Sequence, residues 1–339
     1  MIKLKGGSFA QTYRLTNSII RKIVSKKKDP IRGSLVIEGQ YKWLNFAKES
    51  GLNVPDTIKF EDNKKNSFYE MENINNAKLF VECQSLTQSE KIFKKIVKNL
   101  KKFYDKNRRD SKKNDNLLVD LIHKKAIPSI QLLKKSKEGT IYFNQKYFLI
   151  NNVKCENINS IFKNLHKKEN KFLLRLSKNF DTAYKTVIHG DLTLENIIYK
   201  KNNFYFIDPL GGFMDINFTG NFLHKASPLF DFGKLSQSII GRYETWKDFE
   251  SLENIQSNKF EFKIKMPNKK DFEKFNYLKK NFQFLTKDFE KVVIMHMIII
   301  LCRIIRYRID NNFYSSILCF LVATFWINII KNKIDENLF

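Results

Sequence analysis

The stretch His189-Gly190-Asp191-Leu192-Thr193-Leu194-Glu195-Asn196, followed by Ile207-Asp208-Pro209, decides how this chain folds. It places three oxygen-bearing side chains, those of Asp191, Asn196 and Asp208, at short intervals along the sequence. A site that transfers a phosphoryl group needs such a set, because one group must orient a hydroxyl and two must hold Mg²⁺ against nucleotide phosphates. The stretch therefore predicts a kinase.

Each of these side chains suits one part of that chemistry. An ionised carboxylate accepts hydrogen bonds without donating one, so we expect Asp191 to be the catalytic base for the attacking hydroxyl. Asn196 and Asp208 offer a neutral and an anionic oxygen, which match the ligands that Mg²⁺ prefers. We expect His189 to brace the catalytic turn rather than to touch substrate.

The flanking residues predict how these groups are presented. Thr186-Val187-Ile188 and Ile197-Ile198-Tyr199 are short β-prone runs on either side of the motif. Phe204-Tyr205-Phe206-Ile207 is a further apolar run after a polar turn at residues 200–203. The catalytic loop is then expected between strands, and a hairpin carries both metal ligands.

A His-x-Asp triplet alone also arises by chance, and the asparagine five residues later and the strand-borne aspartate make this pattern specific. His-Gly-Asp-x-x-x-x-Asn followed by Ile-Asp-Pro resembles the aminoglycoside phosphotransferase and choline kinase superfamily of small-molecule kinases. The resemblance implies a two-lobed, protein-kinase-like α+β fold, with a small β-rich N-lobe over residues 1–74 and a larger, mainly helical C-lobe over residues 75–339. It also implies ATP and Mg²⁺ as cofactors and a small molecule as the acceptor substrate.

Protein kinases usually carry His-Arg-Asp and Asp-Phe-Gly instead. Asp231-Phe232-Gly233 comes after the Ile-Asp-Pro aspartate in this chain. In the resembled family, a matching aspartate after a proline and an aromatic residue opens a helix of the larger lobe. The resemblance therefore implies that Asp231 has a structural role behind the site and is not a metal ligand.

A kinase also needs a loop over the phosphates near its N-terminus, together with a lysine and a glutamate that positions it. Gly6, Gly7 and Ser8 lie between two β-prone stretches, where backbone N–H groups can face phosphate oxygens. They resemble the phosphate loop of the family. Gly-Gly-Ser is equally common in plain hairpin turns, so that alternative stays open.

Lys22 lies in the β-prone run of residues 18–24, and the family's nucleotide lysine falls at this place. The resemblance implies that Lys22 binds the α- and β-phosphates and that Glu38, on the next helix, is its ion-pair partner. Gly39 weakens that helix locally. In a chain with 61 Lys and Arg, a lysine on a strand can also belong to a solvated face.

Residues 67–74 are expected to form the strand that leads into a hinge between the lobes. Backbone groups near Glu72 and Ile74 would bind adenine there. The alternative is an ordinary edge strand.

The overall composition is globular, with 42% hydrophobic and 28% charged residues, and 339 residues allow two lobes with a sizeable core. A formal net charge of +26 would ordinarily indicate binding to nucleic acid or to an anionic membrane. The lysines are scattered along the chain, however, so we do not expect nucleic acid as a partner. Such a field would still attract nucleotides and other anionic substrates.

The cysteines are far apart and show neither CxxC nor metal-binding spacing, which argues against a disulfide framework and predicts a reducing compartment. They are Cys83, Cys155, Cys302 and Cys319. The N-terminal residues lack an apolar signal region, so a cytoplasmic location is expected.

The rest of the chain is mostly helical in pattern. Amphipathic helices are predicted over residues 89–103 and 117–133, the second interrupted by Pro128, and a hairpin is predicted over residues 140–149. Two very apolar runs, residues 292–301 and 317–330, are expected to be buried helices. A membrane-spanning helix would need about 20 apolar residues, and insertion into a membrane is not expected.

The sequence is compatible with two functions from different classes. The first is an ATP- and Mg²⁺-dependent kinase that phosphorylates a hydroxyl of a small metabolite, for example a sugar or an amino alcohol of cell-envelope metabolism. The second is an inactive nucleotide-binding regulatory or interaction protein on the same fold. Every position that the chemistry requires is filled, which favours the kinase.

Overall fold

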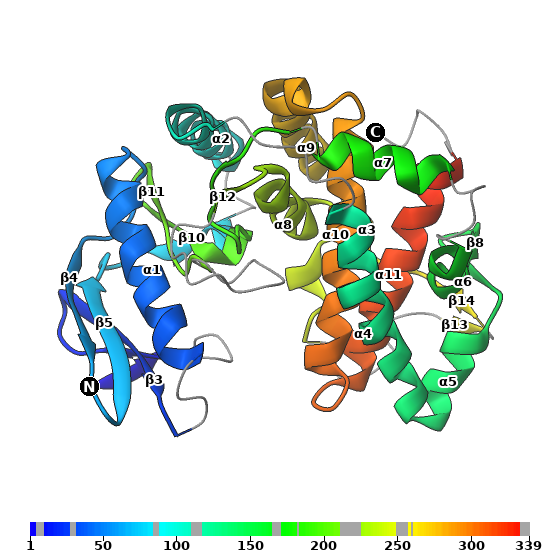
Figure 1. Cartoon of the computed structure of the whole chain (residues 1–339), viewed down its shortest axis with the longest axis horizontal. Helices are drawn as coiled ribbons and strands as arrows, with labels where there is room; N and C mark the ends of the chain where they lie inside the picture. The colour runs from blue at the N-terminus through cyan, green and yellow to red at the C-terminus, as the bar shows by residue number, and fades with distance from the viewer. Residues whose placement is uncertain are drawn as a thin grey trace. The chain divides into compact units, whose positions relative to one another are not determined.

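The structure is a computed structural model of the chain (Figure 1). It describes residues 1–4, 10–27, 32–83, 88–109, 117–164, 171–181, 183–210, 225–248, 257–258 and 260–332. Packing divides the chain into two compact units, each built from two segments. Unit 1 comprises residues 1–110 and 184–231, and unit 2 comprises residues 111–183 and 232–339.

Unit 1 is built on an antiparallel sheet. Within the described residues its strands follow the order β1-β2-β3-β5-β4, with bounds Ile2–Leu4 (β1), Gln11–Arg14 (β2), Ile19–Ser25 (β3), Thr57–Asp62 (β4) and Asn66–Glu72 (β5). The middle of β5, residues 67–71, is buried throughout, so both faces of this strand are covered. The strands expected over residues 18–24 and 67–74 are confirmed as β3 and β5.

Helix α1, Arg32–Glu49, packs on this sheet (Figure 1). The ring of Tyr41 stacks on that of Phe60 in β4, with 5.6 Å between centroids, and lies 6.4 Å from that of Tyr69 in β5. The buried side of the helix recurs at helical spacing, in Val36, Ile37, Gln40, Trp43, Leu44 and Ala47. The helix expected around Glu38 therefore forms, and Gly39 does not interrupt it.

A hairpin in unit 1 carries the second half of the motif. β10, Ile197–Lys200, pairs with β11, Asn203–Phe206, and on its other edge with β6, Lys78–Leu79. Lys201 and Asn202 form the turn with φ angles of 43° and 70°, the left-handed conformation that a two-residue type I′ turn requires. The predicted hairpin is confirmed.

The remaining described elements of unit 1 surround this hairpin. They are the 3₁₀ turns Phe80–Cys83 and Leu194–Asn196, helix α2 (Ser89–Lys106), and the paired strands β9 (Thr186–Val187) and β12 (Lys225–Ala226). Helix α8, Leu229–Ile239, begins in unit 1 and continues into unit 2. The predicted amphipathic helix over residues 89–103 is confirmed as α2, whose apolar side is buried.

Unit 2 is mostly helical. Its described helices are α3 (Leu117–Leu121), α4 (Ile127–Gln131), α5 (Lys137–Asn144), α6 (Ile158–Lys163), α7 (Lys171–Asp181), α9 (Lys269–Phe282), α10 (Phe289–Arg308) and α11 (Phe313–Asn332). A small sheet in the described part has the order β13-β14-β7-β8, with bounds Ser257–Asn258 (β13), Glu261–Phe262 (β14), Tyr147–Ile150 (β7) and Val153–Glu156 (β8). Short 3₁₀ turns cover Leu132–Lys135, Tyr243–Thr245 and Gln283–Leu285.

Helices α10 and α11 form the core of unit 2 and pack against each other (Figure 1). Asn328 is a buried polar residue of α11, and its amide group donates to the backbone oxygen of Glu156 and accepts from its backbone nitrogen, at 2.8 and 2.9 Å. By length and composition alone, α11 could cross a membrane. However, 89% of its most apolar window is buried inside the protein, as in a core helix, which agrees with the expectation for residues 317–330.

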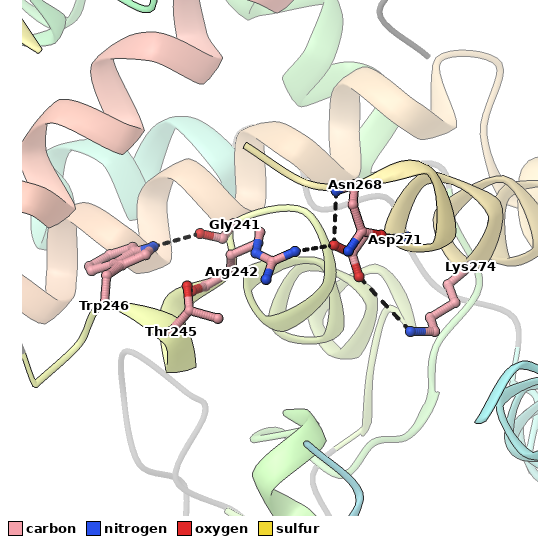
Figure 2. Close-up of polar contacts among 7 residues, drawn as sticks. All are labelled: Gly241, Arg242, Thr245, Trp246, Asn268, Asp271 and Lys274. Carbon is pink, nitrogen blue, oxygen red and sulfur yellow. Dashed lines mark hydrogen bonds and ion pairs between the residues drawn. The ribbon is translucent and has the colours of Figure 1, made fainter. Parts of the chain in front are cut away.

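A polar cluster anchors the start of α9 in unit 2 (Figure 2). Asn268 caps the helix, and Asp271 completes a capping box with it. The guanidinium of Arg242 forms an ion pair with Asp271, and the ammonium of Lys274 lies 3.9 Å from the same carboxylate. The capping box therefore satisfies the backbone nitrogens of Asn268 and Asp271, and Arg242 and Lys274 compensate the charge of the capping carboxylate.

The hairpin predicted over residues 140–149 is wrong in its first half. Residues 137–144 form helix α5, because Ser136 caps it by accepting a hydrogen bond from the backbone nitrogen of Gly139 at 2.9 Å. Only β7, the second half, is a strand, and it pairs with the following strand β8. The local cap prevails here over the strand preference of the residues Thr-Ile-Tyr-Phe.

The helix predicted over residues 117–133 forms, but the break lies before Pro128. A π-helical turn, Ile122–Ala126, joins α3 to α4. Pro128 then lies in the first turn of α4, directly after this π-helical turn.

The fold class predicted from the sequence is confirmed, since a β-rich N-terminal region is followed by a mostly helical C-terminal part. The expected lobe boundary after residue 74 stays a prediction, and the compact units are drawn by packing alone. Residues 75–110 and 184–231 pack with the N-terminal sheet, so the catalytic motif and Lys22 belong to one unit.

Candidate active site

The catalytic loop holds Asp191 and Asn196 in direct contact. The side-chain nitrogen of Asn196 donates to the backbone oxygen of Asp191 at 2.7 Å and to its carboxylate oxygen Oδ2 at 3.0 Å. The amide nitrogen is thus used to orient Asp191, and the amide oxygen, on the opposite side of the group, is the atom suited to a metal.

His189 connects the catalytic loop to the strand before Asp208. Its Nε2 lies 2.9 Å from the backbone oxygen of Ile207, and its Nδ1 accepts from the backbone nitrogen of Asp191 at 3.3 Å. These contacts require a neutral ring with the proton on Nε2, which donates to the carbonyl. Burial lowers the pKa of His189 below its ordinary value of 6.5, which agrees with the neutral form.

Asp231 holds the same turn through hydrogen bonds to its backbone. Its buried carboxylate accepts from the backbone nitrogens of His189 and Gly190, at 2.8 and 2.7 Å, and from the hydroxyl of Tyr104 at 2.7 Å. Burial raises the pKa of this carboxyl, while the His189 ring and the donated hydrogen bonds oppose the shift. Gly190 has a φ of 82°, which favours glycine at this position of the motif.

Asp208 and Lys22 form an ion pair. Nζ of Lys22 lies 2.7 Å from Oδ1 of Asp208, and the exposed fractions of the two side chains are 7% and 31%. Asp208 has a φ of 56°, a left-handed conformation that aspartate tolerates better than most residues do. The backbone nitrogen of Ile207 also donates to the backbone oxygen of Asn196 at 3.0 Å, so the two expected metal ligands lie on directly bonded segments.

The expected ion pair between Lys22 and Glu38 is not formed in the structure. Glu38 pairs instead with Lys42, one turn further along α1, and both side chains are partly exposed. Lys22, in the middle of β3, has Asp208 as its anionic partner, at 2.7 Å. The positioning role of Glu38 stays a prediction.

The hinge residues have part of their backbone already bonded. The nitrogen of Glu72 donates to the oxygen of Asp56 at 2.7 Å, and the oxygen of Ile74 accepts from the nitrogen of Ala77 at 3.0 Å. The adenine contacts expected there would therefore fall to the oxygen of Glu72 and the nitrogen of Ile74. Gly6, Gly7 and Ser8, the expected phosphate loop, lie outside the described residues.

Two residues of the site were not anticipated from the sequence. Trp43 of α1 donates from Nε1 to the backbone oxygen of Ile188 at 2.7 Å, and its ring meets His189 edge-on at 5.0 Å. Tyr104 holds Asp231, as described above. A tryptophan on the apolar side of a helix and a tyrosine at the end of one are both read as core residues, and only the fold reveals their polar partners.

A divalent metal fits the residues that are present. Within the described part of the chain, no group of three or more His, Cys, Asp and Glu side chains could hold a metal ion. Mg²⁺ does not need such a cage, because it is usually bound through one or two carboxylates together with phosphate oxygens and water. Asp208 and the amide oxygen of Asn196 are a donor set of that kind.

The sequence itself matches no family model and no curated protein. Solved structures do match its fold. A candidate fructosamine-3-kinase from Haemophilus somnus superposes with a TM-score of 0.53 at 10% sequence identity, over 94% of this chain and 90% of its own. A glucosamine kinase in complex with glucosamine, ADP and inorganic phosphate superposes with a TM-score of 0.50 at 8% identity, over 92% of this chain and 73% of its own.

At these identities, the likeness establishes a shared fold. Both neighbours are named as kinases of small molecules, and they fit the superfamily that the His-Gly-Asp and Ile-Asp-Pro motifs resemble. The kinase-like fold predicted from those motifs is confirmed.

Proposed function

We propose that this chain is an ATP- and Mg²⁺-dependent kinase that transfers the γ-phosphoryl group to a hydroxyl of a small metabolite. The observation that carries the proposal is the ion pair between Lys22 and Asp208, next to the Asn196–Asp191 contact. A buried cation, a carboxylate that would hold the metal and a candidate base thus belong to one packed unit. This combination is what phosphoryl transfer requires.

In the proposed mechanism, Asp191 accepts the proton of the attacking hydroxyl. The side chain of Asn196 fixes the orientation of the Asp191 carboxylate, and the ring of His189 accepts a hydrogen bond from the Asp191 backbone. The base is therefore already ordered before the reaction. Asp231 and Tyr104 hold the turn that carries the base, and they act only by positioning it.

Asp208 and Asn196 would hold Mg²⁺, and Lys22 would bind nucleotide phosphates. When bound, the ion neutralises the charge that develops on the transferred phosphoryl group. Lys22 is suited to its role because its side chain is almost fully buried, where its charge is screened little by solvent. Its present partner, Asp208, keeps this buried cation compensated.

The acceptor belongs, in our proposal, to the sugars or amino alcohols. The structural neighbours are named for fructosamine and glucosamine, which are amine-bearing sugars with several hydroxyl groups. The formal net charge of +26 favours an acceptor that is neutral or anionic over a polycation. We further propose a reducing, cytoplasmic setting, in which the buried free thiols of the four cysteines persist.

The proposal is tested by incubating the purified protein with Mg²⁺-ATP and a desalted small-metabolite extract, and by searching with mass spectrometry for species that gain one phosphoryl group. Asp191→Asn should reduce the gain by about 10²- to 10⁴-fold, the usual contribution of a general base. Asp56→Asn, which alters an exposed carboxylate paired with Lys48, is the matched control and should leave the gain intact.

ATP binding without any phosphorylated product, in the wild-type protein and with several extracts, would instead favour the regulatory or interaction protein on the same fold. Product formation that survives Asp191→Asn would overturn the role of Asp191 as the base.

A further inference from the structure

Tyr69 lies on the same face of the N-terminal sheet as Lys22. The two residues are direct partners in the register of β3 and β5, and side chains at opposed positions of antiparallel strands point to one face. Lys22 in turn contacts Asp208 at 2.7 Å. The register therefore places the phenol of Tyr69 beside the Lys22–Asp208 ion pair.

The hydroxyl of Tyr69 is buried and has no hydrogen-bond partner among the described residues. A buried hydroxyl without a partner costs free energy, on the order of 1–3 kcal/mol in protein mutational series. Phenylalanine would fill the same space without that cost, so a structural role alone does not account for the oxygen. Burial, and in addition the nearby charge of Asp208, raise the pKa of Tyr69 well above its ordinary value, so the group remains an O–H donor.

The Lys22–Asp208 pair must open if each residue is to perform its proposed task. Lys22 would then contact nucleotide phosphates, and the carboxylate of Asp208, which would hold the metal, would lose the hydrogen bond that Nζ of Lys22 donates. Carboxylates that bind metals are themselves usually held by hydrogen bonds from the protein. A buried O–H group on the same face of the sheet is suited to supply one.

We propose that Tyr69 is a positioning residue of this site, whose hydroxyl donates a hydrogen bond to the carboxylate of Asp208 once Lys22 has moved to the nucleotide. This inference rests on the proposed function. The residue acts through Asp208 and does not touch the acceptor. Its effect is therefore expected in the binding of Mg²⁺ with nucleotide, before any chemistry.

The test is Tyr69→Phe, which removes one oxygen atom and keeps the ring beside Tyr41. ATP binding is measured by calorimetry as a function of the Mg²⁺ concentration, in the full-length protein. The Mg²⁺ concentration for half-maximal tight binding should rise about 10-fold, within the roughly 10- to 100-fold range observed when such supporting hydrogen bonds are removed. ATP binding in EDTA should be unchanged. Tyr41→Phe, on the neighbouring half-buried ring, is the control and should behave like the wild type.

A thermal melt separates this role from a structural one, because Tyr69→Phe should be as stable as the wild-type protein or more stable. Tyr69→Leu, which removes ring and hydroxyl together, should lose stability but show the same rise in Mg²⁺ requirement. If wild-type protein binds Mg²⁺-ATP and Tyr69→Phe needs no more Mg²⁺ than it does, the inference is wrong while the proposed function stands. If the wild-type protein does not bind Mg²⁺-ATP, the proposed function itself fails.

Discussion

The ammonium group of Lys22 lies 2.7 Å from a carboxylate oxygen of Asp208, although the two residues are 186 positions apart in the chain. Lys22 is on the third strand of the N-terminal sheet, and Asp208 follows the second strand of the catalytic hairpin. Their contact joins the N-terminal sheet to the catalytic hairpin within unit 1.

Lys22→Met should weaken the binding of ATP roughly 10- to 100-fold, because a hydrogen bond to a charged group contributes about 1.5–3 kcal/mol. The fold should persist, since Asp208 is 31% exposed and water can replace its lost partner. The matched control is Lys26→Met, which breaks the more exposed pair with Asp62 further along the same chain segment. Titration calorimetry with Mg²⁺-ATP measures the effect, and equal affinities in the two variants would contradict the role of Lys22.

Gly190→Ala should lower both stability and turnover. The residue has a φ of 82°, a left-handed conformation that costs an L-residue roughly 1–2 kcal/mol. Gly51 has a φ of 86°, and a Cβ atom added there would meet no other atom within 4 Å, so Gly51→Ala introduces similar backbone strain away from the catalytic loop. Urea unfolding should show comparable losses in both variants, whereas only Gly190→Ala should reduce phosphoryl transfer. Normal turnover in Gly190→Ala would show that the geometry of this turn is not needed for catalysis.

The stability contributed by His189 should depend on pH. Its pKa is lowered by burial, so below about pH 6.5 the unfolded chain takes up a proton at this residue that the folded chain does not. The free energy of unfolding therefore falls as the pH decreases through this window, by at most about 1.4 kcal/mol per pH unit. In His189→Gln, the unfolded chain takes up no proton at residue 189, because glutamine does not titrate.

The difference in unfolding free energy between wild type and His189→Gln should consequently shrink from pH 7.5 to pH 5.5. The other histidines are common to both proteins and cancel in the comparison. A difference that stays constant over this range, measured by denaturant unfolding, would argue against a neutral, buried ring.

Gly233→Ala should destabilise unit 2 by about 1–3 kcal/mol, the usual cost of overpacking. A Cβ atom at this position would lie 2.1 Å from Nδ1 of His296. Adding His296→Ala should remove the clash, so the double variant should be less destabilised than the sum of the single variants predicts. Additive losses in thermal melts would mean that the ring does not pack on this glycine.

This contact also explains the glycine of Asp231-Phe232-Gly233. Its companions have other tasks, since Asp231 holds the catalytic turn and Phe232 packs on Phe282 with ring centroids 4.3 Å apart. The three residues therefore look like a metal-binding motif in the sequence but serve positioning and packing. In the sequence, their position after the Ile-Asp-Pro aspartate indicates a structural rather than a metal-binding role.

Much of the hairpin and its loop could be predicted because the information is local. Two β-branched or aromatic runs flank a polar turn, and the turn residues Lys201 and Asn202 adopt the left-handed conformations of a short hairpin. The same holds for α2, where apolar residues recur at helical spacing. Such elements can be predicted because their pattern involves only residues that are close together in the sequence.

Other features could not be predicted because they depend on residues far apart in the sequence. Nothing around Lys22 indicates that its partner is Asp208 rather than Glu38, and nothing around Tyr104 indicates that its hydroxyl reaches Asp231. The segment 137–144 shows the opposite failure, since a serine cap made a helix of residues with a strand preference. The capping hydrogen bond of Ser136 and the burial of Phe143 favour the helix there over the strand preference of the residues.

The turn at Lys201 and Asn202 gives the protein a natural place for a reporter. Both residues are exposed, and the paired strands β10 and β11 separate them from the catalytic end of the hairpin, where Asn196 and Asp208 lie. A short peptide tag or a fluorophore inserted between them would lengthen a loop at its tip, where added chain is tolerated best. Labelled in this way, the protein could be immobilised or followed optically in assays of the proposed nucleotide binding and phosphoryl transfer, with the label held away from Asn196 and Asp208.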